Sequence, residues 1–210
     1  MVCLFIWSAE MTVTIVSGHR RSGTSVMMQA LRAGIEYGTL VWGTTDKKNG
    51  NIERDGYIPN PGPILEVGGN YRLAKWLRES LPEDAVVKMF FDGLPNLPLG
   101  DYRIIFMVRD EWEINDSCAR ADKHLRSVNV PENPPSDAAF YVYRKYSQDD
   151  IDHVLGICEA RSDIQLIKVN YSDLIKHPEH ELATLRLLGV PLNVKRAASV
   201  IDPSYYRSKK

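Results

Sequence analysis

The sequence predicts a single α/β domain with three layers and a mostly parallel central sheet. Three observations support this prediction. A β-branched run at 12–17 leads into a glycine-rich turn, further strand-like apolar runs alternate with helical patterns, and a length of 210 residues suits one domain. Apolar residues make up 44% of the chain and charged residues 25%, as in an ordinary globular protein. We therefore expect residues 1–210 to form one domain with helices on both faces of the sheet.

The first predicted unit is a strand, a glycine turn and a helix. Residues 12–17, TVTIVS, are mostly β-branched and suit a buried strand. The turn follows directly, and SVMMQALRAG at 25–34 has the pattern of a helix closed by Gly34. This order is typical of parallel α/β sheets.

The middle of the chain contains two further strands. AVVKMFF at 85–91 and YRIIFMV at 102–108 are continuous apolar runs, which suit central strands covered on both faces. Residues 38–69 are rich in Gly, Asn, Asp and Pro and are predicted to be mostly loop. The segment 70–81 is predicted as a short amphipathic helix.

The second half of the chain continues the alternation. Helices are predicted at 111–125 and 138–160, separated by the irregular, proline-rich segment 129–137. IQLIKVNY at 164–171 is predicted as another buried strand. A last helix is expected at 177–189, with Pro178 in its first turn and Gly189 after its end.

The charge of the chain argues against one class of partner. Acidic and basic residues are mixed along the sequence and the formal net charge is −1 at pH 7, so the basic face of a nucleic-acid-binding protein is not expected. A local basic pocket is compatible with this balance. No apolar run approaches the roughly 20 residues that span a bilayer, and we expect no membrane partner.

The N-terminal segment lacks the features of a signal peptide. MVCLFIW has no basic region and is shorter than a typical signal core. Met11 is a second plausible start, so residues 1–10 are interpreted as a disordered extension or a misassigned start. Cys3, Cys118 and Cys158 are odd in number and widely spaced, which indicates neither a disulfide framework nor a zinc site. A cytoplasmic location is the simple expectation.

The stretch GHRRSGTS at 18–25 has the chemistry of an anion-binding loop. A strand, a glycine-rich turn and a helix direct backbone N–H groups and the positive end of the helix dipole at one point. The loop adds conformational freedom, hydroxyl donors and guanidinium groups through Gly18, Gly23, Thr24, Ser25, Arg20 and Arg21. The alternative is a tight strand–helix turn that binds nothing.

The residue after Gly23 indicates which kind of anion the loop binds. In P-loop NTPases a lysine at that position reaches the β- and γ-phosphates, while the next residue holds Mg²⁺. Here Thr24 takes the place of the lysine. After the strand at 102–108, Arg109 precedes Asp110, and an arginine at a strand end is a poor neighbour for Mg²⁺ but suits a second phosphate. The alternative to a phosphate contact is that Arg109 forms a salt bridge at the strand end. In that alternative, the hydroxyl of Ser117, eight residues later, caps a helix.

Three stretches resemble, in the same order, the motifs of sulfotransferases that use 3′-phosphoadenosine 5′-phosphosulfate (PAPS) and have a P-loop NTPase-like fold. GHRRSGTS resembles the 5′-phosphosulfate loop, and Arg21 makes it closer to the PRSGTT of bacterial and tyrosylprotein members than to the PKSGTT of cytosolic ones. YRIIFMVRDEWEINDS resembles the 3′-phosphate motif, with Arg109 at the strand end and Ser117 eight residues later. IKVNYSDLIKHPEHELATLRLLGVP resembles the YEDL…P…FLG segment. The resemblance extends from residue 12 to about 200.

The resemblance implies that PAPS donates its sulfuryl group to a hydroxyl or amine and leaves as 3′,5′-ADP, with no metal required. The donor-binding residues implied are Gly18, His19, Arg20, Arg21, Ser22, Gly23, Thr24, Ser25, Arg109, Ser117 and Tyr171. PAPS has two separated anionic ends, which a loop and a distant Arg–Ser pair suit better than they suit ATP. The alternative for His19 is that it only fills the turn. The resemblance implies that Tyr171 contacts adenine, and the alternative is that it is a buried residue of the core.

The resemblance also indicates candidates for catalytic residues. Arg21 takes the loop position of the cytosolic enzymes' lysine and, being always protonated, acts electrostatically. Cytosolic members have a histidine base in a KTHLP motif, whereas the counterpart at 86–95, VVKMFFDGLP, has no histidine. Lys88 is expected to reach the transferring sulfonyl group, and Asp92 is either a base or a turn cap. Glu66 is the predicted base, because tyrosylprotein relatives use a carboxylate; a solvated glutamate is the alternative.

Two other functions are carried as alternatives. One is an ATP-dependent small-molecule kinase with a degenerate P-loop, which Mg²⁺-dependent ATP binding distinguishes. The other is a non-catalytic nucleotide-binding protein, which binds 3′,5′-ADP without transfer. The expected partner in the main prediction is a small-molecule or carbohydrate acceptor.

Overall fold

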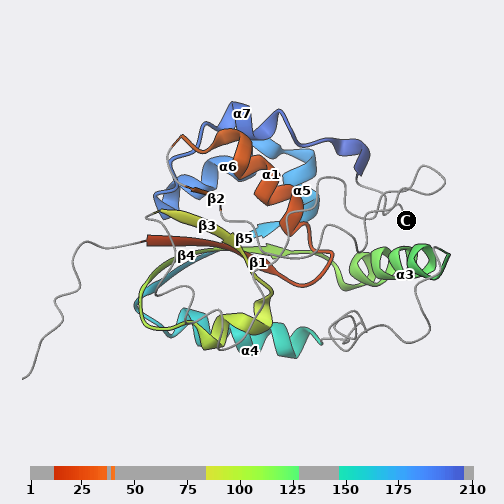
Figure 1. The fold of residues 1–210 in the computed structure, drawn as a ribbon, viewed down its shortest axis with the longest axis horizontal. Coiled ribbons are helices and arrows are strands. Elements are labelled where there is room, and N and C mark those ends of the chain that lie inside the picture. Colours follow the sequence, from red (N-terminus) through yellow and green to blue (C-terminus); the bar gives the residue numbers. More distant parts are fainter. Residues whose placement is uncertain (1–11, 37–38, 41–83, 128–146, 206–210) are drawn as a thin grey trace, which may run out of the picture.

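A computed structural model describes residues 12–36, 39–40, 84–127 and 147–205, with only the backbone described for 39–40, 121–127 and 205. Five strands in these residues form one sheet in the order β2-β3-β1-β4-β5, and every neighbouring pair is parallel. Helices cover both faces of this sheet (Figure 1). The predicted three-layer α/β architecture is therefore confirmed.

The strands are β1 (Thr12–Gly18), β2 (Thr39–Leu40), β3 (Ala85–Lys88), β4 (Asp101–Val108) and β5 (Ile164–Asn170). β1 lies in the middle of the sheet and all of its residues are buried, as the β-branched run predicts. β5 lies at the edge, and only Val169 among its residues is buried. The prediction of a buried strand there was wrong in this respect, because an edge strand has a neighbour on one side only.

Two strand boundaries differ from the prediction. β2 falls in a region predicted to be mostly loop, yet it pairs in parallel with the start of β3. The apolar run at 85–91 was predicted as one strand, but β3 ends at Lys88 and the 3₁₀ helix η1 (Phe91–Asn96) follows. Phe91 and Leu94 in η1 are buried, so the sequence stays apolar after the ladder has ended.

The helices and further 3₁₀ turns are α1 (Thr24–Gly34), α3 (Glu111–Ser127), α4 (Gln148–Glu159), α5 (Tyr171–Lys176), α6 (Pro178–Thr184), η3 (Leu185–Leu188), α7 (Val194–Ala198) and η4 (Pro203–Tyr205). The predicted helix at 177–189 is thus two segments, an α-helix and a 3₁₀ turn. Gly189 ends the second one in the left-handed conformation, with φ 69°.

Capping side chains set two helix starts that the apolar pattern did not predict. Within the helix predicted at 138–160, α4 starts after Ser147, whose side chain forms a capping box with that of Asp150. Tyr171 begins α5 instead of ending β5, because the Asn170 side chain accepts hydrogen bonds from the first turn. The predictions for 1–10, 70–81, 129–137 and 138–146 lie outside the described residues.

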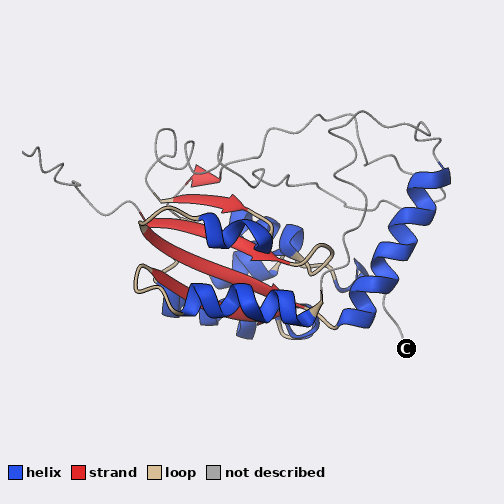
Figure 2. Ribbon diagram, turned by 90° about the horizontal axis from the view of Figure 1, so that it is seen from below, coloured by secondary structure: helices blue, strands red, loops and turns tan. Residues whose placement is uncertain are grey.

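Side chains of the strands alternate between two cores. On one face, Val16, Ile105 and Val169 pack with α1, α5, α6 and α7. On the other face, Ile15 and Ile104 pack with η1 and α4, which lie in front of the sheet in Figure 2. Both faces are apolar because helices cover each of them, which explains why the central strands are continuous apolar runs.

The arrangement of β1 and β4 positions the site. These neighbouring strands run in register, with Gly18 opposite Met107 at their carboxyl ends. The chain leaves β1 through α1 on one face of the sheet and leaves β4 through α3, which projects beyond the carboxyl edge (Figure 1 and Figure 2). In the sheet, β2 and β3 lie on one side of β1, and β4 and β5 lie on the other. In open parallel sheets, ligands bind in the crevice where the strand order reverses in this way.

Candidate anion-binding site

The glycine loop at 18–23 has the tight backbone that the sequence predicted. Gly18 and Gly23 have φ values of 147° and 100°, a region in which side chains are strained. A Cβ on Gly18 would lie 2.6 Å from the Met107 carbonyl oxygen, and one on Gly23 would lie 2.2 Å from Cδ2 of Tyr171. Both glycines are therefore required by close approach as well as by conformation.

The start of α1 presents unpaired backbone donors. The amides of Val26 and Met27 both donate to the Gly23 carbonyl, so those of Thr24 and Ser25 have no acceptor within the helix. The first turn contains no acidic residue. The positive end of the helix dipole is therefore not compensated from within the helix.

A buried hydroxyl in the loop also lacks a partner. The Ser22 residue is fully buried, and its Oγ has no hydrogen-bond partner among the described residues. Buried polar atoms without a partner are uncommon and require an explanation, such as a missing ligand or water.

Lys88 brings a positive charge to the first turn of α1. It ends β3, is only 3% exposed, and its Nζ donates to Oγ of Ser25 over 2.9 Å. The ammonium group that P-loop NTPases have in the loop thus comes here from the neighbouring strand. The contact of Lys88 with a sulfonyl group remains a prediction.

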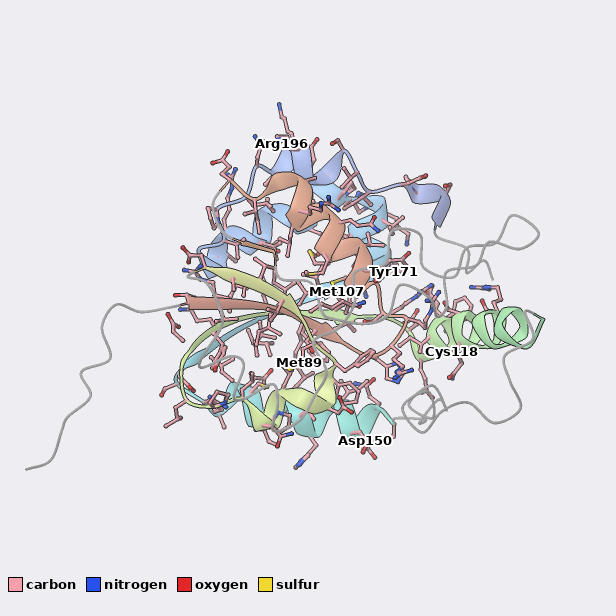
Figure 3. The ribbon with its side chains drawn as sticks, viewed as in Figure 1. Met89, Met107, Cys118, Asp150, Tyr171 and Arg196 are labelled. Atoms are coloured by element: carbon pink, nitrogen blue, oxygen red, sulfur yellow. The ribbon has the colours of Figure 1, made fainter. Side chains whose placement is uncertain are left out.

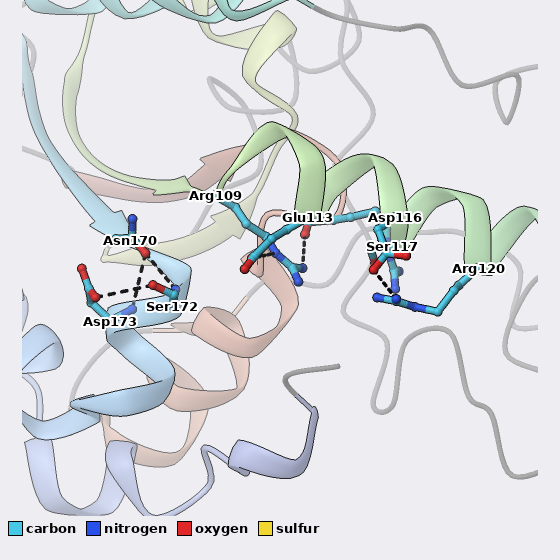
Figure 4. Close-up of polar contacts among 9 residues, drawn as sticks. Arg109, Glu113, Asp116, Ser117, Arg120, Asn170, Ser172 and Asp173 are labelled. Carbon is cyan, nitrogen blue, oxygen red and sulfur yellow. Dashed lines mark hydrogen bonds and ion pairs between the residues drawn. The ribbon is translucent and has the colours of Figure 1, made fainter. Parts of the chain in front are cut away.

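Arg109 joins β4 to the loop and to α3. Its Nε donates to Oε2 of Glu113 and its Nη1 donates to the Arg21 carbonyl, both over 2.8 Å (Figure 4). Its guanidinium carbon lies 4.4 Å from the centre of the Tyr171 ring, a cation–π contact. The side chains of Arg109 and Glu113 are 7% and 3% exposed. The strand-end salt bridge considered as the alternative therefore exists, with Glu113 as a partner that the sequence reasoning did not name.

Arg21 links the same loop to α3 through its side chain. Its Nε donates to Oγ of the buried Ser117 over 3.0 Å. Its backbone has φ 65°, which is uncommon for a residue with a Cβ, and the carbonyl that follows accepts the bond from Arg109. The two residues of the predicted 3′-phosphate motif therefore both contact Arg21.

The first two side chains of the loop pack on the segment after β3. The His19 ring stacks on Phe91 with centroids 6.0 Å apart, and the Arg20 guanidinium lies 4.7 Å from the centre of the Phe90 ring. Burial lowers the pKa of the His19 imidazole below its ordinary value. At neutral pH this ring is therefore uncharged.

The structure brings together all the predicted donor-binding residues and Lys88 at one edge of the sheet. Figure 3 shows Tyr171 beside the start of α1, with Met107 at the sheet next to it. Tyr171 is 4% exposed and belongs to the core, which agrees with the alternative given for it, and its contact with adenine stays a prediction. The predicted base Glu66 lies outside the described residues.

One functional candidate escaped the sequence reasoning. Glu113 was not singled out, although its spacing of four residues from Arg109 on a predicted helix was readable. Its burial was not readable, and burial is what distinguishes it from the half-buried pair of Asp116 and Arg120 one turn further along (Figure 4).

Among the described residues, neither a metal site nor a membrane-spanning helix is found. They contain no group of three or more His, Cys, Asp or Glu side chains placed to hold a metal ion. No helix in the same ranges is long and apolar enough to cross a membrane.

A solved structure of the mouse sulfotransferase SULT7A1 complexed with PAP is similar to this chain. The TM-score is 0.54 at 14% sequence identity, and the match covers 96% of this chain and 69% of the mouse chain. No family model and no curated protein sequence matches. The similarity shows that the chain has the P-loop-like fold of a sulfotransferase.

Proposed function

We propose that the protein is a sulfotransferase that moves the sulfuryl group of PAPS to a hydroxyl or amine acceptor and releases 3′,5′-ADP. The observation that carries this proposal is the meeting of two cationic sites at the carboxyl ends of β1 and β4. One comprises the glycine loop, the start of α1 and Lys88, and the other comprises Arg109 and Ser117. Two sites suit a donor with separate 5′ and 3′ anionic groups.

The residues at the first site fit a 5′-phosphosulfate. The amides of Thr24 and Ser25 have no acceptor within α1, the buried Ser22 hydroxyl has no partner among the described residues, and Lys88 lies at the same turn. Arg20 and Arg21 add positive charge at the loop. Such donors stabilise an anion without needing to reorganise.

The residues at the second site fit a 3′-phosphate. Arg109 and Ser117 lie on the strand end and on α3, and Arg21 connects them. The Arg109 charge is paired with Glu113, and Arg21 brings a second guanidinium group to this site. An arginine at loop position 21, as in bacterial and tyrosylprotein members, suits this second contact because its guanidinium has several donors.

PAPS supplies an activated sulfuryl group on a phosphate leaving group. Lys88 and Arg21 carry fixed positive charge to where negative charge develops on that leaving group. Neither side chain transfers a proton in this proposal, since arginine is always protonated and Lys88 is held as a donor to Ser25. The proposed acceptor is a small molecule or a carbohydrate.

Isothermal titration tests the proposal. The parent protein is expected to bind 3′,5′-ADP with micromolar affinity, about −8 kcal/mol, more tightly than ATP with Mg²⁺. Ser117→Ala is expected to weaken 3′,5′-ADP about tenfold, because a donor–acceptor pair at the 3′-phosphate site is lost. Ser199→Ala removes an exposed hydroxyl at the C-cap of α7; it is the matched control and should leave the affinity unchanged.

The outcome also separates the alternatives. Binding of ATP with Mg²⁺ in preference to 3′,5′-ADP would replace this proposal with the small-molecule kinase. Binding of 3′,5′-ADP without release of product from PAPS would leave a non-catalytic nucleotide-binding protein. Preservation of the unfolding temperature in Ser117→Ala shows that a loss of affinity is local.

A further inference from the structure

Tyr171 lies at the edge of the sheet where three neighbouring strands end. β4 and β5 run in register, and Arg109 and Tyr171 directly follow the last paired residues at their carboxyl ends. The glycine loop follows β1, the strand on the other side of β4. Tyr171, Arg109 and the loop therefore leave three adjoining strands at the same edge.

A helix cap fixes the direction in which Tyr171 leaves its strand. The side chain of Asn170 accepts hydrogen bonds from the Ser172 and Asp173 amides over 2.8 and 3.4 Å (Figure 4). The chain therefore turns into α5 at Tyr171 and does not continue β5. The tyrosine ring enters the core that α1 covers, where the residue is 4% exposed.

One edge of this ring sets the position of the glycine loop. A Cβ on Gly23 would lie 2.2 Å from Cδ2 and 2.8 Å from Cε2 of Tyr171, so the loop backbone packs directly against the ring edge. Gly23 precedes Thr24 and Ser25, whose amides have no acceptor within α1. The direction of these two donors thus depends on where the ring holds Gly23.

The face of the same ring carries Arg109. The guanidinium carbon lies 4.4 Å from the ring centre. Nε and Nη1 of Arg109 donate to Glu113 and to the Arg21 carbonyl, so the ring face is a further restraint on the direction of the guanidinium. One buried ring therefore contacts a residue of the proposed 3′ site and a residue of the proposed 5′ site.

We propose that Tyr171 is a positioning residue that couples the 3′ and 5′ anionic sites of the donor. The inference rests on the proposed function. The ring holds Arg109 in place for the 3′-phosphate and Gly23 in place for the 5′ group, and it does so without contacting the donor itself. The two sites then share one geometry, and binding at each depends on the other. This role differs from the adenine contact that the resemblance implies.

Three nucleotides distinguish a positioning residue from an adenine contact. All contain adenine, but 5′-AMP lacks the 3′-phosphate and 3′-AMP lacks the 5′-phosphate, whereas 3′,5′-ADP has both. The Kd of 5′-AMP divided by that of 3′,5′-ADP measures the contribution of the 3′-phosphate, and is called here the 3′ ratio. The Kd of 3′-AMP divided by that of 3′,5′-ADP is the corresponding 5′ ratio. Titration calorimetry gives both ratios.

The test compares Tyr171→Met with Tyr171→Phe. Methionine fills the buried space without a ring, and phenylalanine keeps the ring. In Tyr171→Met we expect the 3′ ratio and the 5′ ratio each to fall about tenfold, because neither Arg109 nor Gly23 is held in place. Tyr171→Phe should keep both ratios of the parent protein.

Tyr102→Met is the matched control. Tyr102 is also 4% exposed and has a cation–π contact, with the guanidinium carbon of Arg161 5.9 Å from its ring centre. It lies near the start of β4, at the opposite edge of the sheet from the site. Its loss should lower the unfolding temperature and leave both ratios unchanged.

A second variant covers the case in which Tyr171→Met has no cooperative unfolding transition. Arg109→Lys keeps the charge and the tyrosine ring, but it lacks the planar guanidinium that packs on the ring and reaches the Arg21 carbonyl. This change in the 3′ site is expected to lower the 5′ ratio as well, by about fivefold. An unchanged 5′ ratio would overturn the coupling.

Unchanged ratios in Tyr171→Met would overturn the proposal, and an equal weakening of all three nucleotides would then make Tyr171 an adenine contact. A fall in only one ratio would also contradict the coupling of the two sites. Equal falls in Tyr102→Met would attribute the effect to a general loss of stability. Failure of the parent to bind 3′,5′-ADP would remove the proposed function, whereas each of the other results leaves that function in place.

Discussion

The Tyr171 ring lies so close to Gly23 that a Cβ on residue 23 would be 2.2 Å from its Cδ2 atom. The first residue of α5 therefore covers the glycine that starts α1, although the two are far apart in the sequence. Arg109 packs on the same ring. The shape of the anion-binding loop thus depends on a core aromatic as well as on glycine.

Gly23→Ala is expected to destabilise the protein by about 2–5 kcal/mol, because the positive φ of 100° and the steric overlap with Tyr171 add together. Urea denaturation measures this change. In the double variant Gly23→Ala/Tyr171→Ala the steric overlap is removed. The double variant should therefore lose less free energy of unfolding than the sum of the losses of the two single variants. Strict additivity of the two single changes would contradict the contact as described.

Glu113→Gln is expected to lower the free energy of unfolding by about 3–5 kcal/mol, because it removes the carboxylate from a buried ion pair with Arg109. Thermal and urea denaturation check this value. Asp116→Asn is the matched control: its partner Arg120 is also four residues away on α3, but the side chains of Asp116 and Arg120 are 42% and 33% exposed, and the pair should contribute about 0.5 kcal/mol or less. Similar losses in both variants would show that the buried pair has no special role.

Lys88→Met is expected to reduce affinity for 3′,5′-ADP by about 10–100-fold while retaining the fold, since methionine fills the buried stem but has no charge. Titration calorimetry gives the change. Lys168→Met provides the comparison, because this lysine is exposed and pairs with Glu159 on the surface. Equal affinity in parent and Lys88→Met would remove Lys88 from the donor site.

The hydrogen bonds of Asp163 are expected to make the free energy of unfolding depend on pH. Two hydrogen bonds from Arg161 and one from the Gly100 amide hold the pKa of this carboxyl well below its usual range. The stabilisation is therefore complete above the unfolded-state pKa, about 3.9, and is lost as pH falls towards the lower folded value.

Asp163→Asn should destabilise the protein by about 1–3 kcal/mol at pH 7. The difference from the parent should shrink as the pH is lowered below about 4. Denaturation at pH 7, 5 and 3 tests this. A constant difference across that range would mean that the charge of Asp163 is not what stabilises the fold.

The strands were readable from the sequence where hydrophobicity and burial coincide. β1 and β4 follow their apolar runs almost to the residue. The end of β3 was not readable, because Phe91 is as buried in a 3₁₀ turn as it would be in a strand. An apolar run indicates that a segment is buried, but it does not indicate which backbone hydrogen bonds the segment makes.

The site was readable as a set of residue types but not as a network. The glycine loop and Arg109 were identified from their positions after two strands, and Ser117 was identified from the resemblance to the sulfotransferase 3′-phosphate motif. That Arg109 binds the Arg21 carbonyl, and that Arg21 binds Ser117, depends on side-chain directions that only the packed structure sets. The stack of His19 on Phe91 is likewise a contact between segments that the sequence keeps apart.

Arg109 also has a consequence for local opening of the molecule. Its guanidinium donates to α3 through Glu113 and to the glycine loop through the Arg21 carbonyl, so neither segment can separate from the sheet without breaking a bond to a buried charge. The amides of the loop and of the first turn of α3 should therefore exchange with solvent deuterium together, as one cooperative unit.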